Sequence, residues 1–393
     1  MKMTIRQMQT IDKYVGALIC DLLSLLNRVR RLFPVGDKAA RPVKKVALLK
    51  FWGMGTIIVA APSLRSLRKK YPGAEIVFVT FRNNTDIVSM LSIADRTIGI
   101  RIKNGPAAFL KDTLAALLAL RRESVDVLYD LEFFTRFSAI VSFLSGAPER
   151  IGFYSWDIRR GDLHTNNVSF NRYWHMSENF RNLLGVEPPS PGFRLPVNIP
   201  ADAGEFVHHQ MDEQKIPRDN FICVNVNAAV AFGWERRWEG KRFAELTDRL
   251  IEEYGVNAIF IGDRSEREYV AGVIAAGKKQ GYLHNWSGST NAAQLAALFG
   301  ESRMLVSNDT GPLHLAAALG VPTVSFFGSD TPVLYGPQGG QHLIFYRNID
   351  CSPCVSVMVS KEIQCHKGYP QCLYEITVDD VFQAIKAKGI LHK

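Results

Sequence analysis

One loop in the last quarter of the sequence combines residue types that can bind a diphosphate. The segment VSNDTG (306–311) is typical of a buried strand that ends in a turn, and Pro312 after it is favoured at the start of a helix. The free amides at a helix start, with the helix dipole behind them, attract anions. Gly311 would let the backbone approach a phosphate closely, and Thr310 offers a hydroxyl.

Two more side chains of this loop could bind other parts of such a ligand. Asp309 stands at the mouth of the turn, where a carboxylate can bind sugar hydroxyls, and His314 lies one helical turn further on. The tripeptide Asp-Thr-Gly also occurs in aspartic proteases, but that chemistry needs two such loops and the sequence has one. The loop therefore predicts a site for a nucleoside diphosphate and its sugar.

The elements around this loop alternate between strands and helices. We expect strands at 46–51, 75–80, 125–132, 221–227, 257–263, 303–309 and 321–328, with amphipathic helices between them. This alternation indicates an α/β fold with parallel sheets, and ligands of such sheets bind outside the carboxyl ends of the strands. The strand at 303–309 ends at Asp309, which is therefore expected at the ligand-binding edge.

The length of 393 residues suits two domains. We expect an N-terminal amphipathic helix and linker over 1–43, one Rossmann-like domain over 44–200 and a second over 201–393. The stretch 153–200 breaks the alternation and is expected to be a loop-rich connection. Two doubly wound domains would place the active site in the cleft between them.

Charge and hydropathy narrow the classes of partner. The net charge of +9 suggests an anionic partner, such as nucleic acid, an acidic membrane surface or a phosphorylated glycolipid. The sequence has no nucleic-acid-binding motif and its basic residues are dispersed, which disfavours nucleic acid. No apolar run reaches the roughly 18–20 residues of a membrane span.

The N-terminal segment 14–33 has apolar residues at helical spacing and a basic cluster at its end, as in helices that lie in a membrane interface. A helix packed on the protein's own body, or in an oligomer, would show the same spacing.

The stretch 306–339 resembles glycosyltransferase family 9, which includes the heptosyltransferases of lipopolysaccharide core assembly. The family pattern D-T/S-G-x-x-H-x-A-x-A-x-G-x-P, followed by F-G and G-P, is complete at Asp309, Thr310, Gly311, His314, Ala316, Ala318, Gly320, Pro322, Phe327, Gly328, Gly336 and Pro337. The resemblance implies a GT-B fold with the acceptor side in the N-terminal domain and the nucleotide sugar in the C-terminal one. It also implies transfer of a heptose or related sugar, from ADP-heptose, to lipopolysaccharide core or a related envelope glycan. Such an enzyme would be cytoplasmic, with peripheral contact at the inner membrane.

Two looser matches extend the expected donor site. Arg236, in the segment 235–246, stands where the family usually has a phosphate-binding Lys, and Glu266, in the segment 261–268, stands near the nucleotide ribose. The alternatives are a surface charge for Arg236 and a solvated first-turn helix residue for Glu266.

The catalytic base is the point where this sequence departs from the family. An inverting transfer needs a base for the acceptor hydroxyl, and the heptosyltransferases use an Asp directly after the first glycine turn. Thr56 occupies that position here, so we expect it only to line the donor site. Glu132, at the end of the strand 125–132, is the candidate base and Asp130 the second choice. The alternative for Glu132 is an ion pair with Arg136.

No convincing Asp-x-Asp pair is present to bind a diphosphate-bound metal, so we expect a metal-independent transfer in which helix amides and Arg236 meet the leaving-group charge. The departure at Thr56 keeps a second class open, a nucleotide-sugar-binding protein without turnover. A GT-B-like nucleotide-sugar epimerase is a third. A nicotinamide oxidoreductase is disfavoured, because the third glycine of its Gly-x-Gly-x-x-Gly pattern would fall on Ile58.

Four of the six cysteines are clustered near the C-terminus, at Cys351, Cys354, Cys365 and Cys372. A Cys-x-x-Cys pair followed by two further cysteines suits a tetrahedral structural Zn or Fe site, and His366 offers a spare ligand. Disulfides and unbound thiols are the alternatives. Cys20 and Cys223 are expected to be buried apolar residues.

Overall fold

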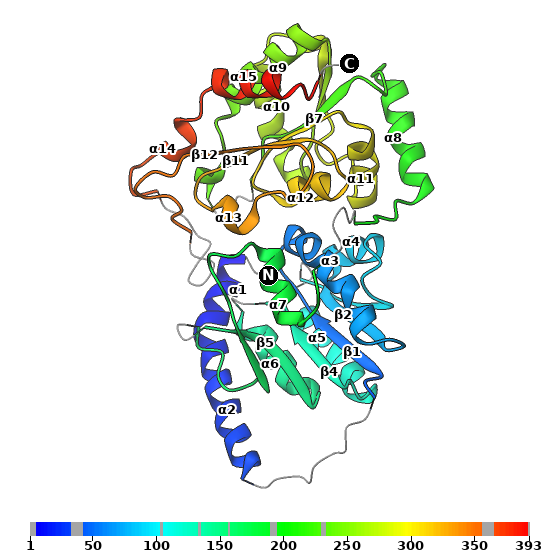
Figure 1. Cartoon of the computed structure of the whole chain (residues 1–393), viewed down its shortest axis with the longest axis vertical. Helices are drawn as coiled ribbons and strands as arrows, with labels where there is room; N and C mark the ends of the chain where they lie inside the picture. Colours follow the sequence, from blue (N-terminus) through cyan, green and yellow to red (C-terminus); the bar gives the residue numbers. More distant parts are fainter. Residues whose placement is uncertain are drawn as a thin grey trace. The chain divides into compact units, whose positions relative to one another are not determined.

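The computed structural model describes residues 5–32, 42–102, 105–132, 135–155, 158–188, 195–228, 233–355 and 365–391. The chain forms two compact units, one that includes Met1–Phe193 and one that comprises Arg194–Ser356 and Ser360–Lys393 (Figure 1). Both are α/β units built on one parallel sheet, so the prediction of two Rossmann-like doubly wound domains is confirmed.

Unit 1 contains a six-stranded parallel sheet in the order β3-β2-β1-β4-β5-β6. Its strands are β1 (Lys45–Leu49), β2 (Glu75–Phe81), β3 (Arg96–Ile100), β4 (Val127–Asp130), β5 (Glu149–Tyr154) and β6 (Asn166–Ser169). The central strand β1 is apolar throughout its buried part, as expected for a strand covered by helices on both faces. The strand order reverses between β1 and β4.

Helices cover both faces of this sheet. They are α3 (Met54–Lys70), α4 (Thr85–Met90), α5 (Pro106–Arg122), α6 (Arg136–Ser145) and α7 (Met176–Leu184), with the short η2 (Arg82–Asn84) before α4. Helix α3 packs against α4 and α7, whereas α5 packs against α6. The N-terminal elements α1 (Ile5–Ile11), η1 (Asp12–Gly16) and α2 (Ala17–Arg31) follow one another without a break, and α2 lies along α6.

Unit 2 repeats the plan with a second six-stranded parallel sheet in the order β12-β11-β10-β7-β8-β9. Its strands are β7 (Phe221–Asn225), β8 (Asn257–Phe260), β9 (Leu283–Asn285), β10 (Leu305–Asn308), β11 (Thr323–Phe327) and β12 (His342–Tyr346). The order reverses between β7 and β10, and this reversal decides where a ligand would bind.

The helices of unit 2 form two groups. They are α8 (Ala201–Glu213), η4 (Trp234–Arg236), α9 (Gly240–Tyr254), η5 (Arg264–Glu266), α10 (Arg267–Ala275), η6 (Gln280–Tyr282), α11 (Ala292–Glu301), α12 (Gly311–Ala318), α13 (Pro332–Tyr335), α14 (Gln371–Tyr374) and α15 (Val378–Lys388). Helices α9, α10 and α15 pack together, and α11 packs against α8 and α12. The buried Trp238 stacks on Phe326 of β11 with ring centroids 4.2 Å apart, at the centre of the core.

The observed strands correct the expected ones in two ways. Each expected strand is present, and all but β2 are shorter than expected, whereas β2 extends one residue further, to Phe81. Strands β3, β5, β6, β9 and β12 had not been predicted. The expected loop-rich connection at 153–200 is wrong in part, since it contains the end of β5 and all of β6 and α7. Strand β6 was missed because it is a polar edge strand without an apolar run.

Within the described ranges no helix is both long and apolar enough to cross a membrane.

Candidate functional site

The Asp-Thr-Gly loop lies where the strand order of unit 2 reverses. Strand β10 ends at Asn308, and Thr310 is the N-cap of α12, which begins at Gly311 with Pro312 in its first turn. The side chain of the N-cap residue Thr310 makes no capping hydrogen bond to this helix start. Doubly wound sheets bind ligands at this switch point, outside the carboxyl ends of the strands. The local geometry is that of an anion-binding helix start.

Three of the residues predicted for the donor site meet around this loop. The guanidinium Nη2 of Arg236 donates to Asp309 Oδ2 at 2.7 Å, and the two side chains are only 10% and 11% exposed. His314 Nε2 lies 3.9 Å from Asp309 Oδ1. A guanidinium has five N–H donors, so Arg236 can hold Asp309 and still donate to a phosphate. Its alternative as a solvated surface charge does not agree with its burial.

Asparagines that the sequence analysis did not single out hold this loop in place. Thr310 Oγ1 accepts from Asn225 Nδ2 at 2.8 Å, which orients the hydroxyl. Asn308 Nδ2 donates to Val226 O at 3.0 Å, and its Oδ1 accepts from Trp238 N at 2.8 Å. The sequence feature that could have revealed this role is an asparagine at the end of each central strand, Asn225 on β7 and Asn308 on β10. A buried amide at such a position can bridge two backbone segments.

Glu266 lies at the end of the neighbouring strand β8. Its Oε2 accepts from Asp263 N at 2.9 Å, within a reciprocal capping box that starts η5. Burial raises the pKa of Glu266, although the Asp263 amide and the Arg237 cation oppose the shift. Gly262 packs so closely that a Cβ there would lie 2.6 Å from Asn227 Nδ2 and 3.2 Å from Glu266 Oε2. Glu266 and Asn227 therefore both lie close to Gly262, and Asn227 in turn is bonded through its carbonyl to Asn308, just before the Asp-Thr-Gly loop. In the structure Glu266 caps the start of η5.

Thr56 and Glu132 belong to unit 1, at the switch point between β1 and β4. Thr56 lies in the first turn of α3, and its hydroxyl donates to Gly53 O at 2.8 Å. Glu132 is completely buried. Its Oε1 accepts from Lys50 Nζ at 2.9 Å, from Phe51 N at 2.7 Å and from Trp52 N at 2.8 Å. The expected alternative partner Arg136 is not among these donors.

This environment bears directly on the role predicted for Glu132. A general base must reach the proton that it takes, whereas the Glu132 carboxylate lies behind the turn that joins β1 to α3. Its second oxygen, Oε2, is buried and has no hydrogen-bond partner among the described residues. The base role stays a prediction, and the contacts favour a role in holding the turn.

Asp130, the second-choice base, is also buried in a polar network. Its carboxylate pairs with Arg160, accepts from Ser138 Oγ at 3.0 Å and lies 3.1 Å from His164 Nε2. Burial favours a raised pKa for Asp130, but the Arg160 cation and His164 outweigh it and hold the pKa below its usual value. Burial lowers the pKa of His164. This network stabilises the carboxyl ends of β4 and β5.

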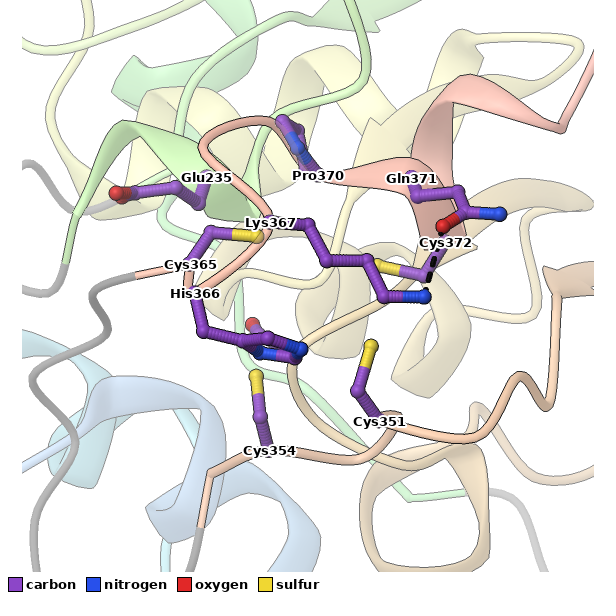
Figure 2. Close-up of a pocket in the computed structure, with 10 residues that line it drawn as sticks. Glu235, Cys351, Cys354, Cys365, His366, Lys367, Pro370, Gln371 and Cys372 are labelled. Carbon is purple, nitrogen blue, oxygen red and sulfur yellow. Dashed lines mark hydrogen bonds between the residues drawn. The ribbon is translucent and has the colours of Figure 1, made fainter.

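The four clustered cysteines line one small cavity in unit 2. Cys351 and Cys354 reach it from one segment, and Cys365, His366 and Cys372 reach it from another (Figure 2). The cavity encloses about 30 Å³ and is also lined by Glu235, Ser329, Lys367, Pro370 and Gln371. All four thiols are free, and burial raises the pKa of Cys372 to about 11. In the part of the chain that is described, no group of three or more His, Cys, Asp or Glu side chains has an arrangement that could hold a metal ion.

The sequence profile described as "Glycosyltransferase family 9 (heptosyltransferase)" matches residues 114–363, which include the Asp-Thr-Gly loop and both switch-point strands β4 and β10. The chain belongs to glycosyltransferase family 9. It is therefore a glycosyltransferase, and the resemblance seen in the stretch 306–339 is confirmed.

Individual family members match over most of their length. The lipopolysaccharide heptosyltransferase 2 of Salmonella typhimurium is 33% identical, over 71% of this chain and 81% of its own. The enzyme of the same name from Escherichia coli K12 is 23% identical, over 85% of this chain and 95% of its own.

Solved structures of the family share the fold. The structure of the Escherichia coli ADP-heptose lipopolysaccharide heptosyltransferase II superposes with a TM-score of 0.69, at 21% identity, over 88% of this chain and 98% of that one. The iron-containing dodecameric glycosyltransferase TibC of enterotoxigenic Escherichia coli superposes with a TM-score of 0.54, at 13% identity, over 88% of this chain and 76% of that one. These likenesses confirm the GT-B class, with two Rossmann-like domains, for this family 9 enzyme.

Proposed function

We propose that this glycosyltransferase transfers a heptose or related sugar from ADP-heptose to the core of lipopolysaccharide or a related envelope glycan. The observation that carries the proposal is the Asp-Thr-Gly loop at the switch point of unit 2, with Arg236 held against Asp309 at 2.7 Å. The named relatives, which are lipopolysaccharide heptosyltransferases, support the choice of donor and acceptor. Nucleotide sugars are cytoplasmic metabolites, so the enzyme would work in the cytoplasm.

The donor would be held by groups that suit each of its parts. The N-terminus of α12, where the Thr310 side chain makes no capping hydrogen bond, offers backbone amides to the diphosphate, and Arg236 adds a cation. Asp309 accepts hydrogen bonds from sugar hydroxyls, and His314, one turn into α12, lies next to Asp309 and contacts the same sugar. Glu266 accepts from the ribose hydroxyls, since its Oε2 lies close to Gly262, two residues after β8 ends.

The transfer would be inverting and independent of a metal ion. The acceptor hydroxyl attacks the anomeric carbon on the face opposite the diphosphate and gives its proton to a water molecule. The bond from that carbon to the diphosphate oxygen breaks with its electron pair on the leaving group. Positive charge from Arg236 and the α12 amides stabilises the departing diphosphate, which is the electrostatic work that a metal performs in other transferases.

We infer that Glu132 positions the turn after β1 rather than taking the acceptor proton. This inference is supported by its burial and by the three donors on one carboxylate oxygen. Thr56, in the first turn of α3, lies beside this turn in unit 1.

A donor-binding screen tests the proposal. Thermal shift and calorimetry would be run with ADP, UDP, GDP, CMP and their sugars, and a ligand that binds only the folded state raises the melting temperature. We expect selective stabilisation by ADP and ADP-heptose. Asp309→Asn should abolish it, whereas Asp380→Asn should not, because Asp380 forms an exposed pair of the same 2.7 Å length with Arg347.

Product analysis then separates the three classes. Transfer of the sugar to a lipopolysaccharide core acceptor, with release of ADP, supports the proposal. Binding of the donor without product or hydrolysis would identify a binding protein. Conversion of the donor without any acceptor would identify an epimerase.

We also propose a structural zinc or iron ion in the cysteine cavity. The donor set fits such an ion, because thiolate sulfur and imidazole nitrogen are the ligands that zinc and iron prefer. Four thiols and His366 line a space of about 30 Å³, which suits a single ion. The iron-containing relative TibC supports iron as one of the two choices. The ion would tie the segment around Cys351 to the segment around Cys372, and no step of the transfer passes through it.

A further inference from the structure

The N-terminal helix α2 is packed with its polar side inward. The residues that it buries are Gly16 just before it, and Ala17, Cys20, Ser24 and Asn27. Their spacing of three or four residues defines one side of the helix. These residues are small or polar, so this side resembles the solvent side of an ordinary surface helix.

Specific contacts hold this polar side on unit 1. Asn27 Nδ2 donates to Asp162 O at 2.7 Å, and Ser24 Oγ accepts from Asp162 N at 2.7 Å. Gly161 lies so close to α2 that a Cβ there would overlap Ser24 and the Cys20 carbonyl. The close packing of Gly161 on Cys20 and Ser24 therefore fixes which side of α2 contacts unit 1. Rotation of the helix about its axis would break this packing and the two hydrogen bonds to Asp162.

The opposite side of the same rod is apolar and exposed. Figure 1 shows α1 and α2 as one long rod along the edge of unit 1, and η1 joins them. The exposed apolar side chains are Ile11, Tyr14, Val15, Leu18, Ile19, Leu22, Leu25, Leu26, Val29 and Leu32, and their exposure ranges from 38% for Ile19 to 75% for Leu32. An apolar surface of this extent on one element marks an interaction site.

The charges on this rod favour an anionic occupant. Lys13 and Arg28 are exposed, and the sequence continues with Arg30 and Arg31. The two acidic residues are both engaged by the protein. Asp12 accepts from the backbone amides of Arg136 and Phe137 at the start of α6, at 3.0 and 2.8 Å, and Asp21 pairs with Arg159. The charges next to the apolar side that the protein leaves unneutralised are therefore mainly positive.

We propose that the apolar side of α1–α2 docks this enzyme on an anionic lipid bilayer, with the rod lying in the plane of the interface. An apolar helix face that ends in basic residues is the pattern of interfacial helices, in which leucines enter the acyl boundary and Arg meets lipid phosphates. No described helix, those of the rod included, is long and apolar enough to cross a bilayer. The biological role of this docking rests on the proposed function, in which the acceptor is anchored in the lipid bilayer.

Vesicle co-sedimentation tests the docking surface without donor or acceptor. The parent should bind vesicles of phosphatidylethanolamine and phosphatidylglycerol, and should bind pure phosphatidylcholine vesicles about tenfold less. Raised salt should weaken the binding, because surface charges are screened. The double variant Leu22→Glu/Leu25→Glu should lose binding at least about tenfold. It should keep the parent's melting temperature, since both side chains are already exposed, at 55% and 60%.

The matched control is Leu114→Glu/Leu118→Glu on α5, where two leucines are similarly exposed, at 51% and 53%. This variant should bind vesicles like the parent, and equal loss in both double variants would overturn the assignment to α2. The proposal is also overturned if the parent does not bind anionic vesicles. The same holds if the parent is a dimer that Leu22→Glu/Leu25→Glu converts to a monomer with no change in vesicle binding, because a second copy would then be the occupant.

A soluble acceptor fragment without acyl chains separates this proposal from the proposed function. Leu22→Glu/Leu25→Glu should transfer sugar to that fragment at the parent's rate. Vesicle binding by a parent that transfers no sugar would leave the docking surface intact and remove the transferase proposal.

Discussion

Lys50 and Glu132 form an ion pair of 2.9 Å in which both side chains are buried, 3% and 1% exposed. The pair joins the end of β1 to the end of β4, at the point where the strand order of unit 1 reverses. The same carboxylate oxygen accepts from the amides of Phe51 and Trp52, which open the glycine turn before α3. The Glu132 carboxylate therefore shapes the turn that leads into α3. Thr56, in the first turn of α3, occupies the position that the family resemblance assigns to a catalytic Asp.

Removing the charge of Glu132 should destabilise unit 1. Glu132→Gln leaves the Lys50 cation buried without its partner, which costs about 3–5 kcal/mol in the free energy of unfolding. The double variant Lys50→Met/Glu132→Gln should recover most of this loss, because neither charge remains. Denaturant unfolding of the three proteins measures both effects.

Activity of the same double variant distinguishes positioning from catalysis. If Glu132 holds the turn, transfer activity should return with stability in Lys50→Met/Glu132→Gln. A double variant that is as stable as the parent but at least about a hundredfold slower in kcat would contradict the positioning role and restore Glu132 as the general base.

Arg236 should contribute to donor affinity through its charge. Arg236→Gln keeps a hydrogen-bond donor but loses the cation beside the α12 N-terminus, and we expect ADP to bind about 10–100-fold more weakly. Arg347→Gln is the matched control, because Arg347 forms an exposed pair with Asp380 in the same unit. Calorimetric titration with ADP measures both, and equal affinities in the parent and Arg236→Gln would contradict the phosphate role.

The stability of unit 1 should fall as the solution becomes acidic. Burial lowers the pKa of His164 below 6.5, so the unfolded chain takes up a proton more readily than the folded one. Folding free energy is therefore lost as the pH falls below about 6.5. The depressed pKa of Asp130 adds a second loss below its unfolded value, near pH 3.8.

The first of these two steps can be assigned with one variant. His164→Gln should flatten the change in melting temperature between pH 7.5 and 5. Scanning calorimetry across this pH range measures it. An unchanged slope between pH 7.5 and 5 in His164→Gln would assign the loss to other groups.

The cysteine cavity should retain metal through purification. Mass spectrometry of the protein, purified without chelators, should find about one zinc or iron per chain, the stoichiometry of a four-thiolate site. Cys354→Ser/Cys372→Ser should lose it, whereas Cys20→Ala should not, because Cys20 lies in unit 1 against α6. Metal content that is equal in both variants, or absent from the parent, would contradict the proposal.

Loss of the metal should also be visible as loss of stability. Metal binding to a folded site adds its free energy to folding, so a strong chelator should lower the melting temperature of the parent and leave that of Cys354→Ser/Cys372→Ser unchanged.

Much of the fold and the donor loop could be predicted because their signals are local. The apolar runs of β1, β7 and β10 and the loop from Asp309 to His314 lie within single short segments, and a parallel sheet requires such runs. The edge strands β6 and β9 gave no such signal, because a half-exposed strand needs few apolar residues.

The sequence by itself determined the fold class, the family and the residues of the Asp-Thr-Gly loop, since strand periodicity and a contiguous motif survive without any tertiary contact. Only the tertiary structure decided that Arg236 meets Asp309, which is 73 positions away, that Glu132 is buried under a turn, and that α2 turns its leucines outward. These outcomes depend on which segments approach one another. Burial and charge pairing are properties of that approach and cannot be read from the spacing within one segment.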